Sequence, residues 1–172
     1  IENDPITVGG YKERLIDVAI RKSNVCCFSK TFKSPLMWSH YSDKHKGICF
    51  EFSLNLGLDN IFPNKTIDII GQVDYDKTNK INYLKDKVQA IAKLFLSKCK
   101  DWSYEEEVRM IVRNEKGLVK FNKDFLSGVI FGCRVTDSDV DEIKALCSKH
   151  DYNSLTFMRA KKGDFDLTFE VL

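Results

Sequence analysis

Residues 34–53, "SPLMWSHYSDKHKGICFEFS", decide the fold class because their periodicity changes half-way along. Ser34 followed by Pro35 is typical of a helix start, since serine caps the first turn and proline is tolerated at the first helical position. We therefore predict a short helix over residues 36–42. After Gly47, "ICFEFS" alternates in the period of two that indicates a half-buried strand. A helix followed at once by a strand of this kind indicates an α+β protein.

The rest of the chain repeats the two patterns. Apolar residues at helical spacing predict helices at about residues 11–22, at 80–99, where Leu84, Val88, Ile91 and Phe95 share a face, and after Thr136 or Asp137. Strands are expected at residues 24–29, 66–76, 105–113, 118–121, 127–133, 154–160 and 165–172, with Gly71 as a bulge. Residues 105–113 and 118–121 resemble a hairpin. This order predicts one domain over residues 1–172, with a mixed to mostly antiparallel sheet and three or four helices.

Composition excludes several classes of protein. The net charge is +2, from 27 basic and 25 acidic side chains, so no overall field draws the chain to nucleic acid or to an acidic membrane. No signal peptide, membrane span, G-x-G-x-x-G, P-loop or G-x-S-x-G motif is visible. The six cysteines lack C-x-x-C spacing and most have apolar neighbours, which argues against zinc and disulfides and favours buried free thiols in a reducing cytoplasm. We expect a cytoplasmic protein with no metal and no membrane partner.

The segment "WSYEEEVRMIVR", residues 102–113, carries the first candidate chemistry. On a strand, Glu107 and Arg109 share one face, while Val108, Met110 and Val112 face the core. This pair is either a carboxylate oriented by a guanidinium at the edge of a cleft or a surface ion pair on a solvated face. The aromatic residues just before it favour the cleft, because ligand pockets are often lined by aromatics.

The helix of the opening stretch is the second candidate. Trp38 and Tyr41 lie three residues apart and share a helical face, and both side chains have polar tips. We predict that these two line a pocket, while Leu36 and Met37 belong to the core. The spacing of His40, Asp43 and His45 matches no zinc pattern, and neither Ser29 nor Ser39 sits on a turn typical of a nucleophile.

Five motifs in order carry a family resemblance. They are N-D-P at residues 3–5, F-S at 28–29, M-W-x-x-Y at 37–41, H-x-G-I at 45–48 and W-x-Y-E-x-E-x-R at 102–109. With them the chain resembles a bacterial family known as domain of unknown function 2971. Members of that family usually carry one more strand before N-D-P, so the resemblance implies that an N-terminal strand is missing here.

The resemblance extends by analogy to ADP-ribosyltransferase-like folds, which use an Arg or His on an early strand, then a strand Ser or Tyr, and then a late-strand Glu that often stands in E-x-E. Ser29 and residues 105–107 match the last two positions, and the early Arg or His would fall in the missing N-terminal strand. The resemblance implies NAD or a nucleotide as substrate, and a bacterial stress or defence effector as the setting. The implied catalytic residues are Glu107 first, then Glu105, Arg109 and Ser29. The implied ligand-binding residues are Asn3, Asp4, Trp38, Tyr41 and Tyr104.

Two other functions are open on the sequence. The first is a non-catalytic module in which the aromatics, Glu107 and Arg109 recognise a small polar ligand or a partner protein. The second is an effector acting on nucleic acid through the lysines around the W-x-x-Y helix, which are Lys30, Lys33, Lys44 and Lys46. The net charge does not favour nucleic acid, and the sequence sets no oligomeric state.

Overall fold

The computed structural model describes residues 14, 17, 18, 20–54, 57, 62, 67–76, 87–113 and 118–172. The chain divides into two compact units, each built from two segments. Unit 1 comprises Ile1–Lys30 and Thr66–Leu118, and unit 2 comprises Thr31–Lys65 and Val119–Leu172. The units are described separately below. The expectation of one domain over the whole chain stays a prediction.

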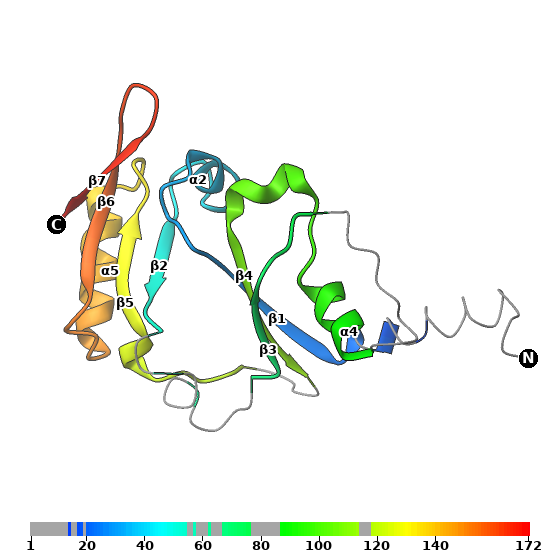
Figure 1. Cartoon of the computed structure of the whole chain (residues 1–172). Helices are drawn as coiled ribbons and strands as arrows, with labels where there is room; N and C mark the ends of the chain where they lie inside the picture. The colour runs from blue at the N-terminus through cyan, green and yellow to red at the C-terminus, as the bar shows by residue number, and fades with distance from the viewer. Residues whose placement is uncertain are drawn as a thin grey trace, which may run out of the picture. The chain divides into compact units, whose positions relative to one another are not determined.

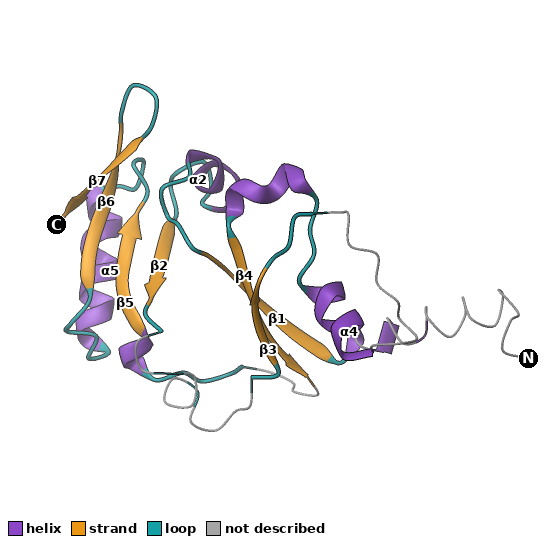
Figure 2. Ribbon diagram, in the orientation of Figure 1, coloured by secondary structure: helices purple, strands orange, loops and turns teal. Residues whose placement is uncertain are grey.

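Unit 1 is built on a three-stranded antiparallel sheet (Figure 2). Its central strand, β4 (Glu107–Arg113), pairs with β1 (Ser23–Ser29) on one side and with β3 (Ile69–Gln72) on the other. Both edges of β4 are therefore occupied. This explains why the expected hairpin partner at residues 118–121 forms no strand: β4 has no free edge for it, and Leu118 is exposed instead.

Unit 1 also contains helical segments. Residues 14, 17, 18, 20 and 21 are helical, in agreement with the helix expected before β1. Of the helix expected at residues 80–99, α4 (Lys87–Phe95) is present and residues 80–86 lie outside the described residues. Helix α4 ends at Phe95. The carbonyl of the next residue, Leu96, accepts a hydrogen bond of 2.7 Å from the backbone N–H of Asp74. Gly71 is no bulge: its register is regular, and a Cβ there would lie 2.6 Å from Leu96 Cδ1.

Strand β4 is covered on both faces. Met110 and Val112 are buried, as the alternation predicts, but Ile111 on the other face has no exposed surface at all, and Val108 is only half-buried. The strand also begins later than expected. Glu105 ends the 3₁₀ helix η1 (Lys100–Glu105), and Glu106 adopts a left-handed conformation with φ of 44°. The E-x-E residues therefore do not share one strand.

Unit 2 is a four-stranded mixed sheet in the order β2-β5-β6-β7, with a helix on one face (Figure 1). Its elements are α2 (Pro35–Tyr41), β2 (Ile48–Phe52), η2 (Lys123–Phe125), β5 (Leu126–Phe131), α5 (Asp137–Lys149), β6 (Thr156–Lys162) and β7 (Leu167–Val171). Only β5 and β6 are parallel, and α5 makes the crossover between them. Val140 of α5 packs with Val129 and Phe131 of β5 in the core. The α+β prediction with mostly antiparallel pairing is confirmed.

Local signals set the helix starts of unit 2. The helix α2 begins at Pro35 as expected, and the side chain of Thr136 caps α5 by accepting a hydrogen bond from the Asp139 N–H. The prediction that Leu36 belongs to the core while Trp38 lines a pocket was wrong. Trp38 is the buried residue, at 3% exposed, whereas Leu36 is 50% exposed. Within the described residues, no helix has the length and apolar composition needed to cross a membrane.

Candidate functional site

Four of the predicted catalytic residues meet in unit 1. Ser29 ends β1 directly opposite Glu107, the first residue of β4. The Ser29 hydroxyl donates to the Glu105 backbone carbonyl at 2.7 Å, which ties the end of η1 to β1. Arg109 follows on the same face of β4 as Glu107.

The charged groups of this cluster form one network. The Arg109 guanidinium donates from Nε to Glu107 Oε1 at 2.8 Å and from Nη2 to Oε2 at 3.0 Å. Lys98 donates to Glu107 Oε2 at 3.2 Å and also pairs with Glu105. The two glutamates are 4% and 2% exposed. The alternative of a surface ion pair is therefore wrong, and the pair is a buried one.

The network keeps Glu107 ionised. Burial by itself would raise the pKa of this carboxyl group, but hydrogen bonds from Arg109, Cys27 and Lys98 outweigh it and lower the pKa to about 2. The hydrogen bond to Glu107 in turn raises the pKa of Arg109. Since both carboxylate oxygens accept from cations, Glu107 is a poor general acid or base near neutral pH.

Two members of the network were not predicted from the sequence. Lys98 lies nine residues before Glu107 and carries no local signal, because only the tertiary structure brings it there. Cys27 lies opposite Arg109 in the β1–β4 register. Partial burial first, and the neighbouring Glu107 second, raise the pKa of the Cys27 thiol to about 11, so this thiol is a weak nucleophile at neutral pH. All six cysteines are free, as predicted, but the expectation that they are buried is wrong, since Cys26 and Cys27 are exposed and the other four are half-buried.

The predicted ligand-binding residues lie in different places. Tyr104 is half-buried in unit 1, where its ring centroid is 6.0 Å from that of Trp102. Trp38 and Tyr41 belong to unit 2. The Trp38 indole N–H donates to the Phe32 carbonyl at 2.7 Å, so Trp38 serves the core, and Tyr41 is 61% exposed. Asn3 and Asp4 lie outside the described residues.

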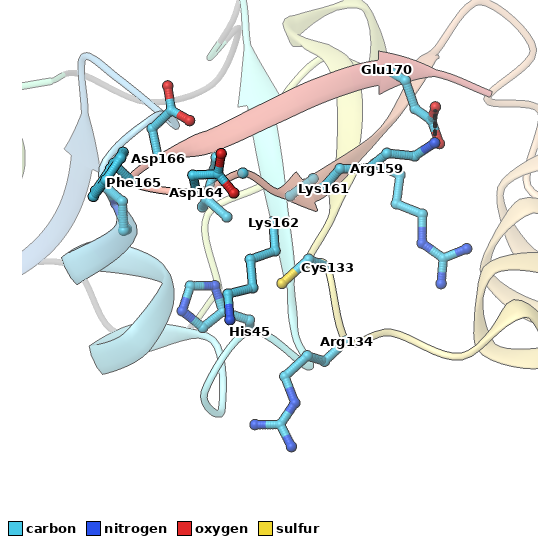
Figure 3. A pocket seen from close by; sticks show the side chains of 14 residues that line it. His45, Cys133, Arg134, Arg159, Lys161, Lys162, Asp164, Phe165, Asp166 and Glu170 are labelled. Atoms are coloured by element: carbon cyan, nitrogen blue, oxygen red, sulfur yellow. Dashed lines mark ion pairs between the residues drawn. The ribbon is translucent and has the colours of Figure 1, made fainter.

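Unit 2 contains a pocket of about 960 Å³ that the sequence did not reveal (Figure 3). Three segments build it: the turn after α2, the loop after β5, and the β6–β7 hairpin. His45, Cys133 and Lys162 lie near its centre, and Arg134 lies at its edge. The other charged lining residues are Arg159, Lys161, Asp164, Asp166 and Glu170.

A strained turn places His45 in the wall of this pocket. Asp43, Lys44 and His45 all adopt left-handed backbone conformations, with φ of 45°, 54° and 70°. Each such residue costs roughly 1–2 kcal/mol for an L-amino acid other than glycine. Long-range hydrogen bonds hold the turn: the His45 carbonyl accepts from the Arg134 N–H at 3.0 Å, and the His45 N–H donates to the Trp38 carbonyl at 3.2 Å. Gly132 permits this close approach, because a Cβ there would lie 2.2 Å from the His45 carbonyl oxygen.

Two cations of the pocket keep their charge uncompensated. Arg159 pairs with Asp137, and Lys161 pairs with Glu170. Neither Lys162 nor Arg134 has an acidic partner among the described residues. These two side chains can therefore attract an anion.

The His45 imidazole is also incompletely bonded. Its Nε2 lies 3.0 Å from the Ser39 hydroxyl, which itself donates to the Pro35 carbonyl at 2.9 Å. Its Nδ1 is buried and has no hydrogen-bond partner within the described part of the chain. Over the same part of the chain, no group of histidine, cysteine, aspartate or glutamate side chains is arranged to hold a metal ion.

Comparisons with known proteins find one family model that matches part of the chain. No curated protein and no solved structure matches the chain, so an ADP-ribosyltransferase-like fold stays a prediction. The model of one family, described as "Protein of unknown function (DUF2971)", matches residues 37–110. The matched segment contains M-W-x-x-Y, H-x-G-I and W-x-Y-E-x-E-x-R, three of the motifs that carry the resemblance. The match covers less than half of the chain, which over residues 37–110 is similar to the DUF2971 family of proteins of unknown function.

Proposed function

We propose that this protein binds a phosphate-bearing small molecule in the pocket of unit 2, with NAD and simple nucleotides as the candidate ligands. The observation that carries the proposal is the pair of uncompensated cations, Lys162 and Arg134, in a pocket of about 960 Å³. Ligand pockets usually measure roughly 300–1,000 Å³. Arginine binds phosphate through its planar fork, and lysine binds it as a point charge.

The strained turn supports a functional role for the same pocket. Three consecutive left-handed residues persist only when the surrounding structure holds them in place. Here the strained turn positions His45 in the pocket wall. The His45 carbonyl also accepts a hydrogen bond from the Arg134 N–H, so the turn fixes the backbone of this pocket-lining cation as well.

A catalytic role for Glu107 in NAD cleavage receives less support. Such a role needs a carboxylate whose negative charge is available to a cationic transition state. In unit 1 the charge of Glu107 is already matched by Arg109 and Lys98. We therefore propose binding as the function and assign the network of unit 1 to stability. A cytoplasmic bacterial effector of stress or defence is the setting that the family resemblance favours.

Isothermal titration calorimetry on the whole chain tests the proposal. The probes are NAD, AMP and uncharged adenosine. NAD or AMP should bind and adenosine should not, because the cations recognise the phosphate. Lys162→Ala should weaken binding roughly 10- to 100-fold, the loss typical of a charge-assisted hydrogen bond. Lys149→Ala is the matched control, since Lys149 is an exposed lysine of unit 2 that does not line the pocket.

Two results would overturn the proposal. One is the absence of binding by NAD and AMP at millimolar concentration. The other is undiminished binding by the Lys162→Ala variant. A single-stranded oligonucleotide serves as a further arm. If it binds with a steep salt dependence while AMP does not bind, the function is nucleic-acid binding and not small-molecule binding.

A further inference from the structure

The tip of the β6–β7 hairpin carries a fully exposed aromatic ring at the rim of the pocket. Phe165 lines the pocket but makes no burying contact, and its side chain is 101% exposed. It lies three residues after Lys162, at the tip of the hairpin (Figure 3). The hairpin is closed by the Lys162–Leu167 pair and by a hydrogen bond of 2.9 Å from the Gly163 N–H to the Asp166 carbonyl.

We infer that Phe165 stacks on the base of a nucleotide whose phosphate lies at Lys162. This inference rests on the proposed function and names the ligand class. Both faces of the Phe165 ring are open to solvent, and covering one of them with a flat apolar ring removes that surface from water. A sugar phosphate without a base would contact Lys162 and leave the ring bare.

The charges around the ring favour a small nucleotide over a polyanion. Asp164 and Asp166 flank Phe165, and both are exposed. Two carboxylates at the tip repel an extended polyanion, so they disfavour an oligonucleotide or an anionic membrane surface at this end. The same carboxylates can accept hydrogen bonds from ribose hydroxyls or from an exocyclic amine. The pocket is thus cationic at Lys162 and Arg134 and acidic around an aromatic ring at the hairpin tip.

Titration calorimetry with AMP and with ribose 5-phosphate separates the base from the phosphate. The wild-type chain should bind AMP more tightly than ribose 5-phosphate by roughly 10-fold or more, the usual size of one stacking contact. Phe165→Ala should remove most of this difference and leave binding of ribose 5-phosphate within about 2-fold, since its phosphate contacts are kept. Phe165→Trp should preserve the preference for AMP. All the variants should fold, because Phe165 contributes nothing to the core.

Tyr41→Ala is the matched control, because Tyr41 is another exposed aromatic of unit 2 and does not line the pocket. It should change neither affinity. If both ligands bind the wild-type chain equally well, or if Phe165→Ala weakens both alike, stacking is refuted while phosphate binding stands. If neither ligand binds, the proposed function is refuted and this inference with it.

Discussion

Arg109 binds both carboxylate oxygens of Glu107, with Nε 2.8 Å from Oε1 and Nη2 3.0 Å from Oε2. The two residues stand two positions apart on β4, so the strand geometry by itself places them on one face. The rest of unit 1 then buries this face, and Lys98 joins the pair from the segment after α4. The result is a compensated ion network whose integrity depends on each partner.

Glu107→Gln should destabilise unit 1. The substitution keeps the shape of the side chain but leaves the buried Arg109 charge without its counter-charge, a change that typically costs about 3–5 kcal/mol. Urea unfolding measures the loss. Glu106→Gln, at an exposed neighbouring carboxylate, should stay within about 0.5 kcal/mol of the wild type. A Glu107→Gln variant that is fully stable but loses NAD turnover would restore the catalytic role predicted from the sequence.

At acidic pH, Glu107 should contribute less to the free energy of unfolding. Its folded-state pKa of about 2 lies below the ordinary value of 4.5, so ionised Glu107 stabilises the native state. This stabilisation, about 3 kcal/mol, is fully present above pH 4.5 and is lost as the pH falls toward 2. The stability difference between the wild type and Glu107→Gln should therefore narrow between pH 5 and pH 2. Urea titrations at several pH values in this range would show it, and a constant difference would contradict the pKa assignment.

Substitution of Trp38 should cost more stability than substitution of Leu36, the reverse of what helical spacing predicts. Trp38→Phe removes the indole N–H that satisfies the Phe32 carbonyl and should cost about 1–3 kcal/mol. Leu36→Ala should cost less than about 1 kcal/mol, since half of this side chain already lies in water. Chemical denaturation measures both, with Tyr41→Phe as a neutral control. A loss above 2 kcal/mol for Leu36→Ala would return Leu36 to the core.

Gly132→Ala should disrupt the pocket wall. The new Cβ would lie 2.2 Å from the His45 carbonyl oxygen, a distance that backbone atoms can relieve only by moving the left-handed turn. We expect a loss of more than about 3 kcal/mol, in the range of severe overpacking. Gly57→Ala is a contrasting control: Gly57 has a positive φ of 74°, unlike Gly132, and has open space around it, so only the backbone penalty of roughly 1–2 kcal/mol applies. A loss for Gly132→Ala that is no larger than the loss for Gly57→Ala would show that small shifts relieve the clash at Gly132.

Lys44→Gly should stabilise the protein. Lys44 adopts a φ of 54°, which glycine accepts at no steric cost. The backbone strain that the substitution relieves exceeds the free-energy cost of the extra conformational entropy that glycine gives the unfolded chain. A gain of about 0.5–1 kcal/mol is expected from thermal unfolding. Lys46→Gly, at an exposed lysine without a positive φ, should instead lose about 0.4–1 kcal/mol. Losses in both variants would refute strain in the turn.

Local features of the sequence determined much of the secondary structure. Ser34 and Pro35 predict the start of α2, Thr136 predicts the cap of α5, and the alternation after Gly47 predicts β2. The proximity of Glu107 and Arg109 was predictable for the same reason, because strand periodicity acts over two residues. Capping and periodicity depend only on neighbours in the chain, so the sequence can show them.

Tertiary structure alone decided burial, edge pairing and the pocket. Residues 118–121 have a strand-like composition, but β4 already has two partners, so no strand forms there. Lys98 joins Glu107, and Trp38 replaces Leu36 in the core, through contacts that no local pattern encodes. The pocket brings His45, Arg134 and Lys162 together from segments far apart in the chain. The free energy of burying or pairing a side chain depends on which distant groups surround it, and these are known only once the chain has folded.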